Sequence, residues 1–246
     1  MLFVVTINYN NLNGLKKTIN SYSNIGIDDV TYILVDGKSN DGSVELINES
    51  NFHTNIIKII EKDDGTYHAM NKAIEKIYSM LNTDNDNFLI FMNSGDEFYN
   101  ISSEILKKCK KNAITVGKNL TDSGDIDIRH NINMLNWSIM PFCHQSAIYN
   151  CNIIKKNDIF FKTSTWSYND YRQIVLLSRV YGLPKYIEDI VCIYEQQTST
   201  GISRSSWKYR FEKIKIMYEL YGLFGPFRII VGKLLSFNCI RNYMYE

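Results

Sequence analysis

Two aspartates that each follow a run of apolar residues are placed where a ligand or a metal ion could bind. Asp36 follows Thr31–Val35, and Asp96 ends the segment Asn93-Ser94-Gly95-Asp96. A carboxylate at a strand end can accept hydrogen bonds from a heterocyclic base or a ribose. It can also ligate Mg²⁺ or Mn²⁺, which prefer oxygen ligands and bridge to phosphates. Each aspartate could instead serve a turn, because Asp-Gly pairs favour turns and Gly95 supplies backbone freedom.

A third polar segment, residues 61–72, combines an acidic loop with the start of a helix. Asp63 lies in the loop, while Asn71 and Lys72 lie in the first turns of the expected helix. The acidic residues could simply stabilise the helix N-terminus. Asparagine has poor propensity for a helix interior, however, so Asn71 indicates a role beyond the helix itself.

The elements that must position these residues alternate between strand and helix. Short apolar runs predict strands at residues 2–7, 31–35, 56–60 and 88–92, with helical spacing between them. This alternation predicts an α/β fold with a mainly parallel, Rossmann-like sheet flanked by helices. Ligands of such sheets bind beyond the carboxyl ends of the strands. The polar segments above all follow strands, so we expect one site at that edge.

The second half of the chain has a less regular pattern. Strands are predicted at residues 113–116 and 186–194, a helix at 168–181 and a polar loop at 119–141. Apolar and basic residues interleave at helical spacing from Trp207 to Tyr221. Gly225-Pro226 breaks this helix and Phe227 to Phe237 resumes it, so we expect a C-terminal helical extension in two parts.

Composition excludes several classes of protein. The net charge of +1 argues against a nucleic-acid partner. The five cysteines are scattered and contain no Cys-x-x-Cys pair, so neither a disulfide framework nor a zinc site is expected. The start of the chain lacks the pattern of a signal peptide, and no apolar run is long enough to span a bilayer. We therefore expect a cytoplasmic protein.

Taken together, the polar segments resemble the motifs of the inverting glycosyltransferases of family 2, which have the GT-A fold. Four motifs occur in the family's order within about the first hundred residues: Thr6-x-Asn8-Tyr9-Asn10, Val35–Ser43, Glu61–Lys72 and Phe91–Phe98. The resemblance implies a GT-A domain over residues 1–203, with a nucleotide-binding half (1–100) and an acceptor-binding half (101–203). Basic and aromatic C-terminal helices would follow at 204–246.

The resemblance also implies roles for individual residues. The donor would be a nucleoside diphosphate-sugar, a UDP-sugar in the first instance, and Asp96 would bind the Mn²⁺ or Mg²⁺ that bridges its diphosphate. Asp36 would bind the base, and Asp63 the base or the ribose. The full set implied for the donor site is Thr6, Asn8, Asp36, Asp63, Asn71, Lys72, Asn93, Ser94 and Gly95.

In the second half of the chain, the resemblance implies an acceptor site and a general base. His144 and Gln145 match a segment that lies near the acceptor in this family. Asp170 matches the position of the general base, which takes the proton of the attacking hydroxyl during an in-line displacement. Asp158 is the alternative base. Gly201-Ile202-Ser203 is similar to a loop element that could fold over the donor.

Two departures from the family pattern keep other functions open. His68 and Asn93 each stand where the family usually has an aspartate. With Asn93 in place, Asp96 is the motif's remaining carboxylate, so a catalytically inactive module that binds a glycan or a nucleotide-sugar is an alternative. A nucleotidyltransferase is a second alternative, although no glycine-rich loop with Lys or Arg follows the first strand. A dehydrogenase is disfavoured because no G-x-G-x-x-G follows any predicted strand.

The basic and aromatic C-terminal stretch suggests where the acceptor is held. Between Ser203 and Glu246 the sequence has eight Lys and Arg against three Glu. Such a helix could dock on anionic lipid, as a peripheral contact with the inner face of the cytoplasmic membrane. The acceptor would then be a lipid-linked glycan of a bacterial lipopolysaccharide O-antigen, capsule or exopolysaccharide. Helices packed on the domain with a solvated basic face are the alternative.

Overall fold

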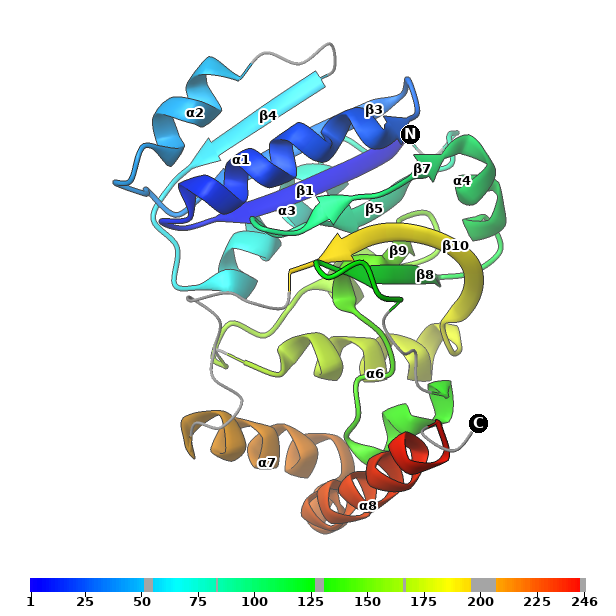
Figure 1. Cartoon of the computed structure of the whole chain (residues 1–246). Helices are drawn as coiled ribbons and strands as arrows, with labels where there is room; N and C mark the ends of the chain where they lie inside the picture. Colours follow the sequence, from blue (N-terminus) through cyan, green and yellow to red (C-terminus); the bar gives the residue numbers. More distant parts are fainter. Residues whose placement is uncertain (51–54, 83, 127–130, 166, 196–206, 244–246) are drawn as a thin grey trace.

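The computed structural model describes residues 1–50, 55–82, 84–126, 131–165, 167–195 and 207–243. The loop predicted at Gly201-Ile202-Ser203 lies outside these residues. Within them, the predicted α/β fold is confirmed: a mixed eight-stranded sheet carries helices on both faces, and the chain ends in helices (Figure 1).

The first half builds the parallel part of the sheet. Its strands are β1 (Leu2–Asn8), β3 (Val30–Asp36), β4 (Asn55–Ile60) and β5 (Phe88–Phe91), and its helices are α1 (Leu12–Asn20), α2 (Ser43–Glu49) and α3 (Thr66–Tyr78). β3 and β5 pair in parallel with the two edges of β1, and β4 pairs in parallel with β3. In this register Asn8 lies opposite Asp36, so both side chains reach the same edge of the sheet.

The second half extends the same sheet beyond β5. The sheet order is β4-β3-β1-β5-β9-β8-β10-β6. β8 (Ile114–Thr121) and β10 (Lys185–Tyr194) pair in parallel, whereas β9 (Ala147–Asn150) and β6 (Glu97–Phe98) run antiparallel to their neighbours. A separate pair of short strands, β2 (Ile25–Gly26) and β7 (Ile101–Ser102), lies beside α4 (Ser103–Cys109). Both halves of the chain therefore contribute strands to one sheet, from β1 to β10.

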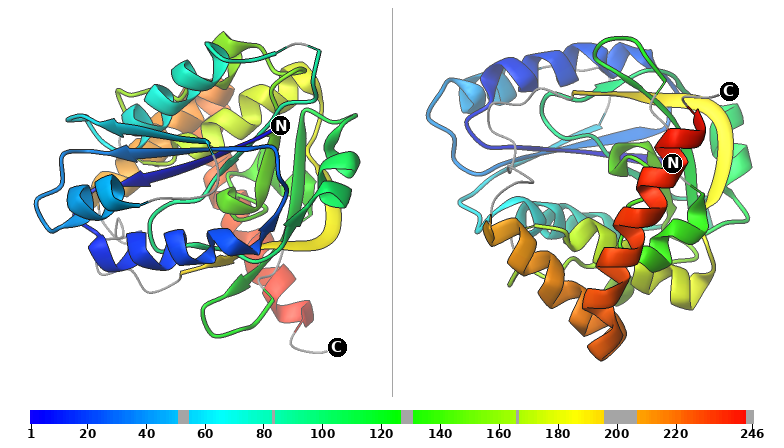
Figure 2. Two further views of the ribbon diagram at one scale, coloured as in Figure 1. Left: turned by 90° about the horizontal axis from the view of Figure 1, so that it is seen from above. Right: turned by 60° about the horizontal axis from the view of Figure 1, so that its bottom comes forward.

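Alternating strand residues fill two separate cores. Phe3 and Val5 of β1 point to the face covered by α3, where Met70 and Ile74 are buried. Leu2 and Val4 point to the opposite face, which α1, α2 and α4 cover. Because both faces are covered, the central strands are apolar along their whole length. Figure 2 (left) shows the helices on either side of the sheet.

The predicted polar loop at 119–141 contains more structure than the sequence indicated. β8 continues to Thr121, and a 3₁₀ turn, η2 (Ile132–Trp137), contacts the last helix of the chain, α8 (Gly225–Tyr243). Two further short helical segments were not predicted: η3 (His144–Ser146) and α5 (Lys156–Ile159). η3 leads directly into β9 and contacts β5, β8 and β10.

The C-terminal helices form a hairpin that packs below α6 (Asn169–Tyr181) (Figure 1). α7 (Trp207–Tyr221), η4 (Gly222–Phe224) and α8 (Gly225–Tyr243) follow one another without a long loop. α7 buries Ile216, Met217 and Leu220 in the main core. A Cβ at Gly232 would lie 1.9 Å from Trp137 O, so α8 can approach η2 this closely because residue 232 has no side chain. Figure 2 (right) shows α8 crossing in front of this region.

Candidate functional site

The carboxylate of Asp36 is the centre of a hydrogen-bonded cluster at the strand ends. Asn8 Nδ2 donates to Asp36 Oδ2 at 2.7 Å, Ser39 Oγ donates to the same oxygen at 2.8 Å, and Ser39 N donates to Oδ1 at 2.7 Å. The backbone turns back after Asp36, as aspartate favours when its side chain bonds the amide of a nearby residue. Asp36 is consequently 0% exposed. In this conformation it organises the turn, and the base contact expected from the sequence stays a prediction.

Asn8 extends this cluster to the turn that follows β5. Its Oδ1 accepts a hydrogen bond from Ser94 Oγ at 2.8 Å. Asn8 therefore connects the ends of β3 and β5 across β1, and three of the predicted donor residues are brought together. The predicted residue Thr6 lies deeper. Its hydroxyl is 2.9 Å from the Tyr32 hydroxyl, and its side chain is buried.

Asp63 offers the more accessible carboxylate at this edge. It is partly exposed, and its Oδ1 accepts a bond from Gly65 N at 2.9 Å. Its Oδ2 lies so close to Gly37 that a Cβ there would be 2.8 Å away. Asp63 thus lies directly against the turn that Asp36 organises. Tyr9, which is 65% exposed, lies equally close, because its ring would be 2.9 Å from the same Cβ.

Thr18 of α1 fixes the backbone of the turn of residues 93–96. Thr18 Oγ1 donates to Asp96 O at 2.7 Å and accepts from Gly95 N at 3.0 Å, and it is also 3.2 Å from Asn93 O. Gly95 has a φ of +111°, a conformation that favours glycine. A Cβ on it would lie 2.5 Å from Glu195 Oε2. The backbone of this turn is therefore fixed by Thr18, which the sequence did not single out.

Asp96 itself is buried beside a second carboxylate. Its Oδ1 accepts a hydrogen bond from Glu195 N at 3.0 Å, and 5% of the residue is exposed. Burial raises the pKa of Asp96 to about 7, and the nearby Glu195 carboxylate adds to this rise. Bonds from Glu195 N and from the Gln145 side chain oppose it, as does the charge of Lys17. Asp96 therefore changes charge near neutral pH.

The residues around Asp96 fit a divalent cation that is shared with a ligand. Among the described residues, no three His, Cys, Asp or Glu side chains cluster closely enough to hold a metal ion. Asn93 Oδ1 is buried beside this turn and has no hydrogen-bond partner, so it is an oxygen that could complete a ligand set. Asp96, Asn93 and the neighbouring Glu195 all present hard oxygen donors. The other ligands would have to come from water or phosphate.

Two further residues predicted for the donor site are engaged in fixing α3. Asn71 Nδ2 donates to Phe161 O, and Asn71 Oδ1 accepts from Phe161 N, both at 2.8 Å. Lys72 Nζ donates to Lys62 O at 2.8 Å and pairs with Glu61 Oε2 at 3.5 Å. The unusual helix-interior asparagine therefore ties α3 to the segment before α6, and Lys72 holds the acidic loop in place. A donor-binding role for either residue stays a prediction.

η3 carries two polar residues predicted for the acceptor site, Gln145, which lowers the pKa of Asp96, and His144, whose pKa is affected by the charge of the predicted base, Asp170. The adjacent His144 is buried, and its ring stacks on Phe91 with centroids 5.6 Å apart. Its Nε2 lies 3.0 Å from the Tyr149 hydroxyl. Burial lowers the pKa of His144, and the charge of Asp170 opposes this shift, which places Asp170 within electrostatic reach of η3.

Asp170 lies at the first turn of α6 and is partly exposed. Its Oδ1 accepts the bond from Tyr171 N at 2.8 Å, and its Oδ2 has no hydrogen-bond partner among the described residues. One carboxylate oxygen is thus left to accept a proton. Three of the predicted residues in the second half, His144, Gln145 and Asp170, therefore occupy one region.

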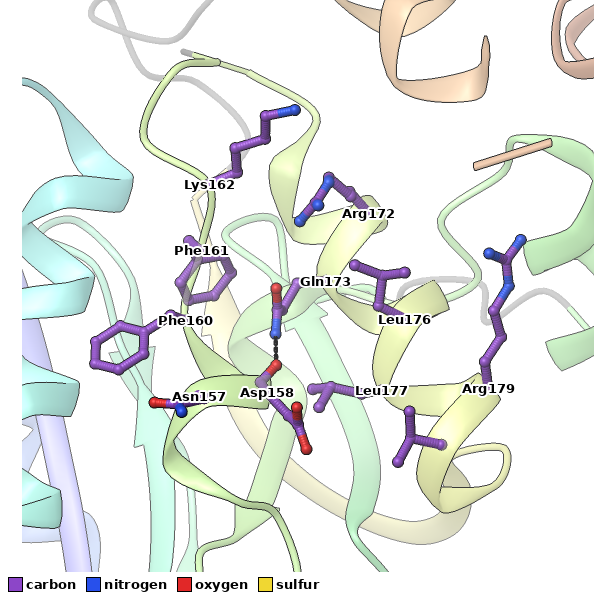
Figure 3. Close-up of a pocket in the computed structure, with 11 residues that line it drawn as sticks. Asn157, Asp158, Phe160, Phe161, Lys162, Arg172, Gln173, Leu176, Leu177 and Arg179 are labelled. Atoms are coloured by element: carbon purple, nitrogen blue, oxygen red, sulfur yellow. Dashed lines mark hydrogen bonds between the residues drawn. The ribbon is translucent and has the colours of Figure 1, made fainter. Parts of the chain in front are cut away.

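The alternative base, Asp158, lies elsewhere. Its Oδ2 accepts a hydrogen bond from the Tyr181 hydroxyl at 2.5 Å. It lines a pocket of about 480 Å³ between α5 and α6 (Figure 3). Two of the pocket's three cations, Lys162 and Arg172, pair with Glu219 of α7 at 2.7 Å each. This pocket does not contain any of the strand-end carboxylates, and the choice of Asp170 over Asp158 stays a prediction.

Comparison with known families settles which family this sheet and its strand-end residues represent. A family profile described as "Glycosyl transferase family 2" matches residues 3–157. The chain belongs to glycosyl transferase family 2. This confirms the resemblance read from the four motifs and supports the prediction of a glycosyltransferase. No curated protein matches the chain in sequence.

Solved structures show the same fold at low sequence identity. The S. aureus TarS 1–349 complex with UDP-GlcNAc has a TM-score of 0.64 at 14% identity, covering 89% of this chain and 66% of that one. A longer S. aureus TarS structure gives the same TM-score at 15% identity, and there the match covers 39% of TarS. The mannosyltransferase PcManGT from Pyrobaculum calidifontis, in complex with GDP-Man and Mn²⁺, has a TM-score of 0.59 at 13% identity over 95% of this chain and 73% of that one. The chain therefore spans less than two thirds of the TarS chains. The fold is the GT-A fold.

Sequence reasoning missed several residues that shape the site. Ser39, Thr18 and Glu195 all bond directly to predicted site residues. Ser39 lies inside the matched segment Val35–Ser43, so its motif position could have indicated it. Thr18 and Glu195 lie far from their partners in the sequence, and no local pattern marks them.

Proposed function

We propose that this chain is an inverting, metal-dependent glycosyltransferase that uses a nucleoside diphosphate-sugar donor, in the first instance a UDP-sugar. The sugar transferred is a hexose or an N-acetylhexosamine, and the acceptor is a glycan. The observation that carries this proposal is the turn of residues 93–96, because Asn8 joins its Ser94 to Asp36 at the strand ends and its Asp96 accepts a bond from Glu195 N. The strand-end cluster and the metal-ligand candidate therefore border one site.

The nucleotide binds at the edge formed by the ends of β1, β3 and β5. Asp63 is the carboxylate best placed to bond the base or ribose, because it is partly exposed and lies against Gly37. Asp36, Asn8 and Ser39 hold that turn in shape. The UDP-GlcNAc in the TarS complex supports a UDP-sugar, and the GDP-Man in the mannosyltransferase complex makes a GDP-sugar the second choice.

A divalent cation, Mn²⁺ or Mg²⁺, would be held by Asp96 together with Asn93 or Glu195 and the donor phosphates. When bound, it would offset the negative charge of the departing diphosphate. Thr18 keeps the turn of residues 93–96 in position, and Gly95 keeps its backbone close to Glu195. The Mn²⁺ in the mannosyltransferase complex supports the choice of metal.

Asp170 takes the proton of the acceptor hydroxyl. As that oxygen forms a bond to the anomeric carbon, the bond from this carbon to the diphosphate breaks and its electron pair leaves with the diphosphate. Attack on the face opposite the leaving group inverts the configuration, so an α-linked donor gives a β-linked product. His144 and Gln145 border the space that the acceptor must enter.

A donor panel tests this function. The protein is incubated with Mn²⁺ and UDP-, GDP- and dTDP-sugars, with and without acceptor extracts, and the released nucleoside diphosphate is measured. We expect release from a UDP-sugar, and we expect Asp96→Ala and Asp170→Asn each to reduce it by about two orders of magnitude or more. If nucleotide binds but no donor is cleaved, the inactive binding module is correct instead. Full activity of Asp96→Ala would refute the metal assignment.

We also propose that the C-terminal hairpin docks on an anionic membrane surface, where a lipid-linked acceptor would lie. Trp207, Phe211, Ile214 and Tyr218 recur along one side of α7, and all are exposed, Trp207 by 82%. Phe227, Ile230 and Leu234 continue an exposed apolar stripe on α8, and Leu223 and Phe224 expose 83% and 74% at the turn. Large exposed apolar patches of this kind mark interaction surfaces.

The charges around this stripe favour lipid over a second copy of the chain. Residues 207–235 contain six Lys and Arg but two Glu, and one of these, Glu219, is engaged by Lys162 and Arg172. Two such surfaces would repel each other, whereas anionic lipid would attract each cation by about 1 kcal/mol near the membrane. No helix among the described residues is long and apolar enough to cross a membrane, so the contact would be peripheral.

Sedimentation with liposomes tests this contact. We expect the protein to sediment with vesicles that contain about a third anionic lipid, and a Trp207→Ser/Phe211→Ser/Phe227→Ser variant to remain in solution. Deleting residues 224–246 should have the same effect. Binding that is unchanged in both variants would refute the proposal, and so would a stable dimer in which these residues are buried. The expected location is the inner face of the cytoplasmic membrane.

A further inference from the structure

The N-terminus of α6, which carries Asp170, is capped by a side chain from another helix. Tyr67 of α3 accepts a hydrogen bond through its hydroxyl from Asn169 N at 3.0 Å, and a longer one from Asp170 N at 3.4 Å. The first amides of a helix lack partners within the helix and need such acceptors. The N-cap residue, Tyr168, provides no side-chain hydrogen bond to these amides. Tyr67 therefore does, from about a hundred residues away, what an N-cap side chain would do locally.

All four first amides of α6 are accounted for in this arrangement. Asn169 N and Asp170 N bond to the Tyr67 hydroxyl, and Tyr171 N bonds to the Asp170 carboxylate. Arg172 N bonds to Tyr168 O. The backbone of Tyr168 has a φ of 61°, an uncommon conformation for a bulky residue. The turn that presents Asp170 is thus built in an unfavourable conformation and depends on Tyr67 for two of its four amide bonds.

Tyr67 is itself held rigidly and lies on the donor side of the site. It is 9% exposed, and its ring stacks on Phe161 with centroids 5.4 Å apart. Asn71, one turn further along α3, fixes the backbone of the same Phe161. Burial raises the pKa of Tyr67 well above its usual range, so the hydroxyl stays protonated. α3 begins immediately after the loop that contains Asp63.

We propose that Tyr67 is a positioning residue that holds the base Asp170 in register with the donor-binding loop. This inference rests on the proposed function, because it assumes that Asp170 is the base. α3 carries Tyr67 at its first turn and follows Asp63 directly, so one rigid helix start connects the nucleotide-binding loop to the turn that presents the base. Without the hydroxyl, two amides lose their acceptor and the first turn of α6 can move. A displacement of about 1 Å at a reacting group can reduce a rate about a hundredfold.

Matched tyrosine variants test this inference. Tyr67→Phe removes the hydroxyl and keeps the ring. Tyr78→Phe is the control, because Tyr78 lies on the same helix and its hydroxyl also bonds to a backbone atom, Ile154 O at 2.7 Å, away from α6. The assay is hydrolysis of the best UDP-sugar from the donor panel, with water as acceptor, together with UDP binding by calorimetry and thermal unfolding. Asp170→Asn is measured in parallel.

We expect Tyr67→Phe to lower kcat about ten- to a hundredfold, with the donor KM and the UDP affinity unchanged. Tyr78→Phe should lower the midpoint of thermal unfolding by a similar amount and leave kcat unchanged. The inference is overturned if Tyr67→Phe retains kcat within twofold while Asp170→Asn is inactive, or if it raises the donor KM and leaves kcat intact. If Asp170→Asn retains full activity, the assignment of the base fails, and the proposal for Tyr67 fails with it.

Discussion

Exchanging the polar side chains of Asp36 and Asn8 provides a sharp test of how the strand ends are organised. In Asp36→Asn, an NH₂ group that donates hydrogen bonds replaces one carboxylate oxygen. Whichever way this amide turns, it faces a donor, because Asn8 Nδ2 and Ser39 Oγ approach one oxygen at 2.7 and 2.8 Å and Ser39 N approaches the other at 2.7 Å. Asn8 can turn over only by exchanging its bond with Ser94 as well.

The expected cost follows from the bonds that are lost. Hydrogen bonds to a charged group contribute about 1.5–3 kcal/mol each, and relief of the buried charge offsets part of their loss. We expect Asp36→Asn to lower the free energy of unfolding by about 2–4 kcal/mol. For a chain of this length, that corresponds to a fall of roughly 5–15 °C in the unfolding midpoint. Asn8→Asp alone should also destabilise, because it places two carboxylates together.

The double exchange, Asn8→Asp with Asp36→Asn, restores a partner for every group. The carboxylate at position 8 accepts from Ser94 Oγ and from the amide introduced at position 36, whose oxygen still accepts from Ser39 N. Ser39 Oγ loses its acceptor at position 36 but lies 3.3 Å from Asn8 Nδ2, so it can donate to the carboxylate at position 8 instead. We expect the double variant to recover to within about 1 kcal/mol of the parent, measured by urea and thermal unfolding. It should also regain UDP affinity if Asp36 acts by organising the turn. A bonded Asn8–Asp36 pair at the strand ends is contradicted if the two destabilisations simply add, or if Asp36→Asn is as stable as the parent.

Three further predictions concern the turn of residues 93–96. Thr18→Val keeps the shape of the side chain but leaves the Gly95 amide without its acceptor. We expect the free energy of unfolding to fall by about 1–3 kcal/mol and Mn²⁺-dependent UDP binding, measured by calorimetry, to weaken. An unchanged unfolding midpoint would contradict this. Gly95→Ala places a Cβ on a residue with a φ of +111° and 2.5 Å from Glu195 Oε2. We expect it to lower the free energy of unfolding by about 1–3 kcal/mol and to abolish Mn²⁺-dependent donor cleavage. Normal cleavage would contradict the close approach of this turn to Glu195. Because the pKa of Asp96 is raised to about 7, Mn²⁺ affinity should fall about tenfold for each pH unit below 7, and a flat profile in Mn²⁺ titrations would argue against Asp96 as ligand. The metal-free protein should lose stability as pH rises from about 4 to 7, because the folded state then keeps a proton on Asp96 that the unfolded chain releases.

The sequence could predict the parallel half of the sheet because each strand there is a continuous apolar run. Runs such as Leu2–Ile7 are apolar throughout because both faces of the sheet are covered. The strand-end position of Asn8 and Asp36 followed from the same reasoning. β9 (Ala147–Asn150) could not be recognised in this way, because its short run gains its place beside β5 only through pairing with residues about sixty positions away.

The details of the site depended on long-range contacts that no local pattern contains. A strand-end aspartate is expected to face a ligand, yet Asp36 is buried because Ser39 folds back onto it. Asn71 was correctly singled out as unusual for a helix interior, but its partner in the structure is the backbone of Phe161, ninety residues away. The clustering of Asp170 with η3 likewise arises only when α6 packs against the sheet.

The most direct test of the central claim is nucleoside diphosphate release from a panel of nucleotide-sugars in the presence of Mn²⁺. We predict that the parent chain releases UDP from at least one UDP-sugar, that EDTA suppresses this release, and that Asp96→Ala and Asp170→Asn abolish it while Asp158→Asn does not. Absence of nucleotide release across the whole panel, with acceptor extracts supplied, would contradict the account, whether or not UDP binds.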